Sequence, residues 1–105
     1  MPTNKTGFAL VKKLPRNISN IEDGKQLTRS SGSVGANYIE ANESLSKKDF
    51  TMRIMISRKE AKESQYWLRL VDTQENAMLE KERQNLTKEA TELMMIFSAI
   101  MRKSS

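Results

Sequence analysis

The sequence contains no cysteine and no histidine. Without cysteine there are no disulfides, thiolate metal sites or cysteine nucleophiles, and without histidine the commonest general base and transition-metal ligand are missing. Only 4 glycines and 2 prolines are present, so the turns that a β-rich fold needs are scarce. We therefore expect an all-helical protein that is not an enzyme and that uses no cofactor, no metal and no small-molecule substrate.

Long apolar runs are also absent. The longest, 93–97, is far shorter than the roughly 20 residues that cross a bilayer. The segment Met1 to Gly7 is polar and lacks the apolar stretch of a secretory signal. The sequence predicts a cytoplasmic protein with no membrane partner.

Positive charge is in excess of negative charge. The formal net charge is +5, and residues 1–59 hold 11 Lys and Arg against 5 Asp and Glu. This imbalance favours a polyanionic partner such as RNA or DNA, although a basic surface can also serve solubility alone.

Apolar residues at helical spacing predict four helices in one domain spanning 1–105, with 1–7 and 103–105 frayed. A short first helix ends before Pro15, and 16–23 reads as a connection because Asn and Ser favour turns. Ser46 is expected to cap the third helix. The predicted helices are 8–14, 24–43, 47–71 and 79–102.

The third helix carries an unbroken seam. Phe50, Ile54, Ser57, Ala61, Ser64, Leu68 and Val71 alternate steps of four and three residues. Other faces of the same helix are apolar as well, which a bundle of this size cannot enclose. We therefore expect self-association through an interface made of Met52, Met55, Ile56, Tyr66 and Trp67.

A basic stripe is predicted on one flank of the third helix. Arg58, Lys62 and Arg69 stack there by the helical period. Such a stripe can follow a phosphate backbone, and Arg29, Lys47 and Lys48 could extend it. The alternative is a solvated face or pairing with acids on a neighbouring helix. Because no base-reading motif is present, any recognition should be of the backbone kind.

Two polar features favour structural roles. Asn37 lies at a seam position of the second helix, where it needs partners; Ser33, Glu40 and Arg29 are near in sequence, and Glu60 could approach from the third helix. Three Glu-x-x-Glu pairs begin at Glu40, Glu60 and Glu89. Di-metal bundles normally use Glu-x-x-His, so surface pairing with lysines is the better interpretation.

Four segments carry a family resemblance. They are Arg29–Ala41 (RSSGSVGANYIEA), Ser46–Phe50 (SKKDF), Glu60–Leu68 (EAKESQYWL) and Glu89–Leu93 (EATEL). In this order they resemble the bacterial four-helix-bundle family, also called the 23S rRNA intervening-sequence protein family. The similarity covers about 24–102.

The resemblance implies an up-and-down antiparallel four-helix bundle that forms ring-like homopentamers. Some relatives are encoded in insertions of ribosomal RNA genes, and others resemble the accessory protein of diversity-generating retroelements, which engages nucleic acid and a reverse transcriptase. For most members no activity is known. The first helix here is shorter than is usual in the family.

Three function classes follow from these observations. The first is a non-catalytic homo-oligomeric adaptor that binds nucleic acid, or a nucleoprotein partner, through its basic surface. The second is a purely structural or protein-docking bundle that exposes Met52, Met55, Tyr66 and Trp67. The third, a carboxylate metalloenzyme, would purify with iron or manganese bound.

Overall fold

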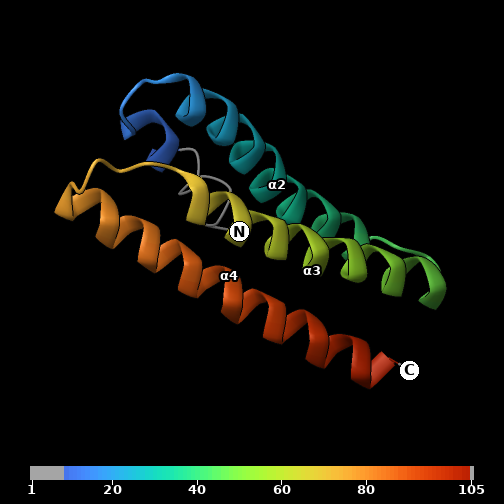
Figure 1. Cartoon of the computed structure of the whole chain (residues 1–105). Helices are drawn as coiled ribbons and strands as arrows, with labels where there is room; N and C mark the ends of the chain where they lie inside the picture. The colour runs from blue at the N-terminus through green and yellow to red at the C-terminus, as the bar shows by residue number, and fades with distance from the viewer. Residues whose placement is uncertain (1–8, 105) are drawn as a thin grey trace.

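The computed structural model describes residues 9–104, and within that range the chain forms four helices and no strand (Figure 1). The first helix, α1, covers 9–13 of the described residues. The three long helices are α2 (Ile18–Asn42), α3 (Lys47–Leu70) and α4 (Ala77–Ser104). The all-helical fold with a short first helix is confirmed. The predicted fraying of 1–7 lies outside the described residues, whereas α4 continues through Ser104.

The three long helices run up and down, with α3 in the middle (Figure 1). α3 packs along both α2 and α4, while the backbones of α2 and α4 are not adjacent within the described residues. The short α1 meets the opposite end of α4 from the C-terminus, where Lys13 Nζ lies 2.9 Å from Glu82 Oε1. The bundle is therefore a row of three long helices, with α1 adding a fourth element at one end.

The helices begin at polar caps. Asn17 accepts from the Asn20 amide at 2.8 Å, Ser46 accepts from the Asp49 amide at 3.1 Å, and Asn76 accepts from the Leu79 amide at 3.0 Å. The cap at Ser46 is the predicted one. The prediction that 16–23 is a connection was wrong from residue 18 onward, because Asn17 caps a helix there instead of forming a turn.

The predicted seam of α3 is confirmed. Six of its seven residues are buried, and Phe50 is half-buried; the buried ones are Ile54, Ser57, Ala61, Ser64, Leu68 and Val71. Ser64 Oγ lies 2.9 Å from Ser30 Oγ, and Ser57 Oγ donates to the Val34 carbonyl at 3.1 Å, so the small hydroxyls facing α2 are satisfied. Small side chains thus allow α2 and α3 to approach closely while these hydroxyls keep hydrogen-bond partners.

Two apolar clusters make up the core. The first lies at the α1 end and joins all four helices: Leu10, Leu14, Leu27, Leu68, Val71, Leu79 and Leu86. The second lies toward the other end: Val34, Ala41, Ile54, Ala61 and Phe97. The small-residue seam between α2 and α3 runs through both.

Of Gly24 and Gly35, only Gly24 lies where a larger side chain would clash with a neighbouring helix. A Cβ at Gly24 would lie 2.9 Å from Val11 Cγ1, so α1 and α2 approach closely at Gly24. A Cβ at Gly35, by contrast, would meet none of the described residues within 4 Å. The close contact occurs at Gly24 because α1 packs against the first turns of α2, whereas Gly35 lies farther along that helix.

Candidate nucleic-acid interface

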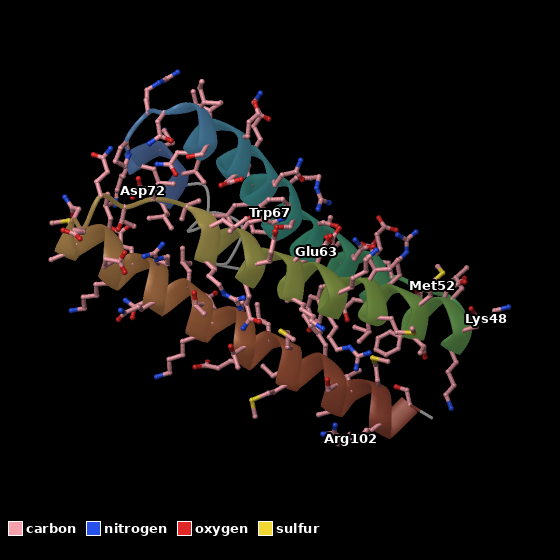
Figure 2. The ribbon with its side chains drawn as sticks, in the orientation of Figure 1. Lys48, Met52, Glu63, Trp67, Asp72 and Arg102 are labelled. Atoms are coloured by element: carbon pink, nitrogen blue, oxygen red, sulfur yellow. The ribbon has the colours of Figure 1, made fainter. Side chains whose placement is uncertain are left out.

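A continuous shallow furrow runs along the outer side of the contact between α3 and α4. It consists of three depressions of 570, 510 and 530 Å³. The first two share Met94 and Ser98, and the last two share Gln65. We call this feature the α3–α4 furrow. Figure 2 shows Met52 near one end of α3 and Arg102 at the adjoining end of α4.

Cations line the α3–α4 furrow throughout. They are Arg58, Lys59, Lys62, Arg69, Arg83, Lys88 and Arg102. Among the described residues that line it there is no aspartate or glutamate. A groove lined by charge of one sign concentrates the positive potential and attracts polyanions.

Some of these cations are already engaged. Arg58 donates to Ser98 Oγ at 3.3 Å, and Arg83 donates to the Val71 carbonyl at 2.6 Å and to Glu80. Lys62, Arg69 and Lys88 are exposed and make no hydrogen bond or ion pair within residues 9–104. These three side chains are the ones free to meet an incoming phosphate.

The predicted stripe maps onto the furrow only in part. Arg58, Lys62 and Arg69 lie together in it, as their spacing indicated. Lys47 and Lys48 are exposed in the first turn of α3 but do not line it. Arg29 does not line the furrow either, because its guanidinium is held in ion pairs on the α2 side of α3.

The α4 wall of the furrow was missed by the sequence analysis. Arg83, Lys88 and Arg102 come from α4. The spacing could have indicated a shared basic face, because Lys88 and Arg102 are fourteen residues apart, which is about four helical turns. Nothing in the sequence, however, indicated that this face of α4 adjoins the basic flank of α3.

The predicted structural polar residues form a network between α2 and α3, with one exception. Arg29 Nη1 lies 3.0 Å from Glu60 Oε2, and Arg29 Nη2 lies 3.6 Å from Glu63 Oε2. Asn37 Nδ2 donates to the Ser33 carbonyl at 2.9 Å. Glu40 was predicted to join them but is exposed and its carboxylate lies outside the network.

Asn37 also gains a partner that the sequence analysis did not name. Arg53 Nη1 donates to Asn37 Oδ1 at 3.0 Å, linking α3 back to α2. Both the amide and the carbonyl of the half-buried Asn37 side chain are therefore used. The network joins two helices by charge-assisted hydrogen bonds and has a structural role.

The two carboxyls of this network have opposite pKa shifts. Burial alone would raise the pKa of Glu60, but hydrogen bonds with Glu63, Arg29 and Ser33 outweigh it and lower the pKa. The pKa of Glu63 is raised by its hydrogen bond to Glu60 and by partial burial. As pH falls, Glu63 therefore takes up a proton before Glu60 does, and Glu60 stays ionised against Arg29 to lower pH.

These shifts predict a pH-dependent stability. The lowered pKa of Glu60 contributes stability that is present above the ordinary glutamate pKa of about 4.3 and is lost as pH falls through the lower folded value. Glu63 acts in the opposite sense, because its raised pKa costs stability as pH rises through it. Urea titrations across this range should show Glu60→Gln losing stability relative to wild type at pH 7 and the difference shrinking below pH 4. A constant difference would contradict the assignment.

The five predicted interface residues separate into two groups. Met52, Met55 and Ile56 line the furrow beside Met94. Tyr66 is 51% exposed, whereas Trp67 packs against the core cluster at the α1 end and meets Tyr66 edge to face at 4.9 Å. Trp67 is thus mostly a packing residue, contrary to the exposed surface predicted for it.

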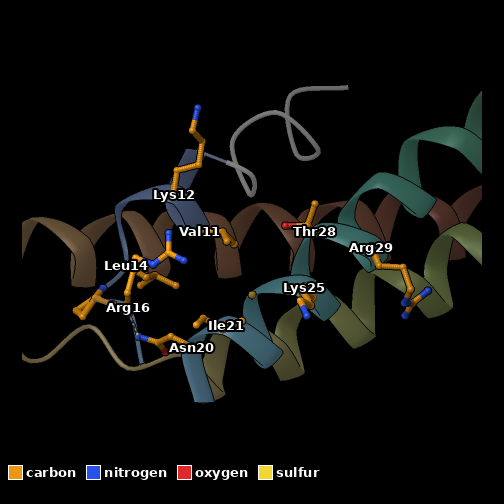
Figure 3. Close-up of a pocket in the computed structure, with 11 residues that line it drawn as sticks. Val11, Lys12, Leu14, Arg16, Asn20, Ile21, Lys25, Thr28 and Arg29 are labelled. Carbon is orange, nitrogen blue, oxygen red and sulfur yellow. Dashed lines mark hydrogen bonds between the residues drawn. The ribbon is translucent and has the colours of Figure 1, made fainter. Parts of the chain in front are cut away.

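A separate depression of 690 Å³, outside the furrow, lies between α1 and the start of α2 (Figure 3). Apolar Val11, Leu14 and Ile21 line it together with basic residues. Figure 3 shows the Arg29 guanidinium turned away from these apolar side chains, and Lys25 Nζ lies 3.8 Å from Glu22 Oε1. Two of its cations, Lys25 and Arg29, are thus held in ion pairs.

Two further findings concern other classes of site. No helix within residues 9–104 has the length and apolar character that a bilayer span requires. In the same part of the chain, no three acidic side chains gather closely enough to hold a metal ion.

The fold and the furrow together define a class, the all-helical bundles with a basic outer groove. The particular family follows from comparison. Residues 3–99 match the family described as 23S rRNA-intervening sequence protein, and the chain belongs to this family. The resemblance noted in the sequence is therefore confirmed.

A solved structure shares the fold. It is the crystal structure of a protein with unknown function from the S23 ribosomal protein family of Bacteroides thetaiotaomicron VPI-5482. The TM-score is 0.72 at 24% identity, and the alignment covers 94% of this chain and 97% of the other. Comparison with curated proteins gives no match.

Proposed function

We propose that this protein is a non-catalytic, cytoplasmic, homo-oligomeric adaptor that binds nucleic acid, or a nucleoprotein partner, through the α3–α4 furrow. One observation carries the proposal: the described lining of the furrow has seven cations and no carboxylate. The family description refers to an intervening sequence of 23S rRNA, and the solved relative is assigned to a ribosomal protein family. Both names agree with a nucleic-acid setting.

The mechanism is neutralisation of phosphates. Free cations at Lys62, Arg69 and Lys88 would release condensed counterions from a bound strand, so affinity falls as salt rises. Arg58 and Arg83 are partly engaged within the bundle and hold the walls of the furrow in place. Recognition of this kind is independent of sequence.

Charge reversal in the furrow tests the proposal. The triple variant Lys62→Glu, Arg69→Glu, Lys88→Glu removes the unpaired cations without breaking a described hydrogen bond. We expect binding to labelled RNA and DNA, followed by fluorescence anisotropy at low salt, to weaken at least tenfold. The slope of log affinity against log salt should become shallower by roughly two units for a single strand.

A matched control separates the furrow from net charge. Lys25→Glu, Lys81→Glu, Lys103→Glu changes the net charge by the same amount at exposed positions outside the furrow. We expect this variant to retain most of the affinity. Equal weakening by both variants, or no wild-type binding at low salt, would reject the furrow as a nucleic-acid interface.

Self-association is part of the same proposal. Tyr66 and Leu70 are 51% and 44% exposed on α3, outside the furrow, and leave apolar area for a second copy. A ring such as the homopentamer that the family resemblance implies would repeat weak sites and raise avidity without new contacts. Sedimentation equilibrium tests this, and a strict monomer at micromolar concentration would contradict it.

The alternative is a protein-docking bundle without a nucleic-acid role. The exposed methionines at one end of the furrow favour it, because thioether side chains adapt to varied partners. The two functions differ in their response to salt. Absence of binding to RNA and DNA at low salt would leave docking as the better account.

A further inference from the structure

The α3–α4 furrow changes character along its length. One half is polar and cationic, with Gln65, Gln84 and Thr87 between its basic residues. The other half combines cations (Arg58, Lys59, Lys62 and Arg102) with apolar side chains: Met52, Met55, Ile56, Met94 and Met95. Phosphate neutralisation explains the cations but does not explain the methionines.

These methionines are accessible. Met52 and Met55 are each 47% exposed, and Met95 is 66% exposed. On α3, Met52 and Met55 precede Lys59 and Lys62 on one stripe with helical spacing. On α4, Met95 lies seven residues from both Lys88 and Arg102 and so shares their face. On α3 the two thioethers thus lie about two turns before the two cations, and on α4 Met95 lies between two cations, each about two turns away.

The form of the nucleic acid decides whether such a surface is useful. A duplex presents its phosphate backbone outward. Phosphates placed against the methionines would lose their hydrating water without gaining a hydrogen-bond or ionic partner. A single strand exposes the flat faces of its bases, which pack on apolar and polarisable side chains while its phosphates meet the cations. The mixed lining suits the second form.

We infer that the α3–α4 furrow takes unpaired, single-stranded RNA or DNA, with bases against the methionine half and phosphates on Lys62, Arg69 and Lys88. This inference rests on the proposed nucleic-acid function of the furrow. It adds the class of ligand and a role for Met55 and Met95. Because the contacts are apolar packing and charge, binding is tolerant of sequence.

The test compares a mixed-sequence single strand with the duplex of the same sequence, in RNA and DNA forms, using the full-length protein. The variant is Met55→Ser, Met95→Ser, and the control is Met78→Ser, a 69% exposed methionine of α4 outside the furrow. We expect wild type to prefer the single strand. The double variant should bind it roughly fivefold more weakly, with duplex affinity changed less than twofold, and Met78→Ser should match wild type.

Each other outcome has a distinct meaning. Equal or stronger binding of the duplex overturns the inference and leaves the proposed function intact. No binding of either form at low salt overturns the proposed function as well. If sedimentation shows that the double variant dissociates into monomers while single-strand affinity is unchanged, the methionines are subunit contacts and the inference fails.

Discussion

Replacing Asn20 by alanine is expected to lower the free energy of unfolding by roughly 2–3 kcal/mol. Asn20 is 4% exposed. Its Nδ2 donates to the carbonyls of Pro15 at 2.9 Å and Asp72 at 2.8 Å, and its Oδ1 accepts from the Asp72 amide at 2.8 Å. One side chain thus joins the connection before α2 to the connection before α4. Truncation leaves three partly buried backbone groups without partners, and urea denaturation measures the loss.

Two companion variants show whether the hydrogen bonds carry this effect. Asn20→Asp keeps the size but cannot donate to either carbonyl, so it should be at least as destabilised as Asn20→Ala near neutral pH. Asn85→Ala, at an exposed position of α4, should change stability by less than about 0.5 kcal/mol. A loss below about 1 kcal/mol for Asn20→Ala would mean that water replaces the bonds.

Replacing Phe97 by alanine is expected to cost about 3–5 kcal/mol. Phe97 is 1% exposed and is the largest side chain of the second core cluster. Its ring centroid lies 6.0 Å from that of Tyr38, so it links α4 to α2 although those helix backbones are not adjacent in the described part. The cavity would open in the second core cluster, where α2, α3 and α4 meet. Thermal and urea denaturation provide the measurement.

The matched variants for Phe97 differ in burial and volume. Phe97→Leu keeps most of the apolar volume and should cost less than about 1.5 kcal/mol. Its neighbour Ile96 is 52% exposed, and Ile96→Ala should lie within about 0.5 kcal/mol of wild type. If Phe97→Ala matched Ile96→Ala, the second cluster would not be a packed core.

Part of the candidate site could be predicted from helical spacing alone. Arg58, Lys62 and Arg69 lie on one helix, and the helical period of about 3.6 residues places them on the same flank of it. The free or engaged state of each cation could not be predicted. Arg29 resembles the others in sequence, yet Glu60 and Glu63 hold it, because both carboxyls project from α3 toward α2.

The polar residues near the start of α2 show the same limit. Asn17 and Asn20 were interpreted as turn formers, which is a common role of asparagine. One is a helix cap and the other a buried clamp. The partner of that clamp, Asp72, is 52 residues away in the chain, so no local pattern could indicate it.

The sequence by itself determined the helical class, the cap at Ser46, the seam of α3 and the family, because these depend on residue type and on spacing within one segment. Only the tertiary structure decided that α4 supplies the second wall of a basic furrow, that methionines line half of it, and which cations remain unpaired. Helical period fixes which residues share a face of one helix. The orientation of one helix face against another depends on packing between segments distant in the chain.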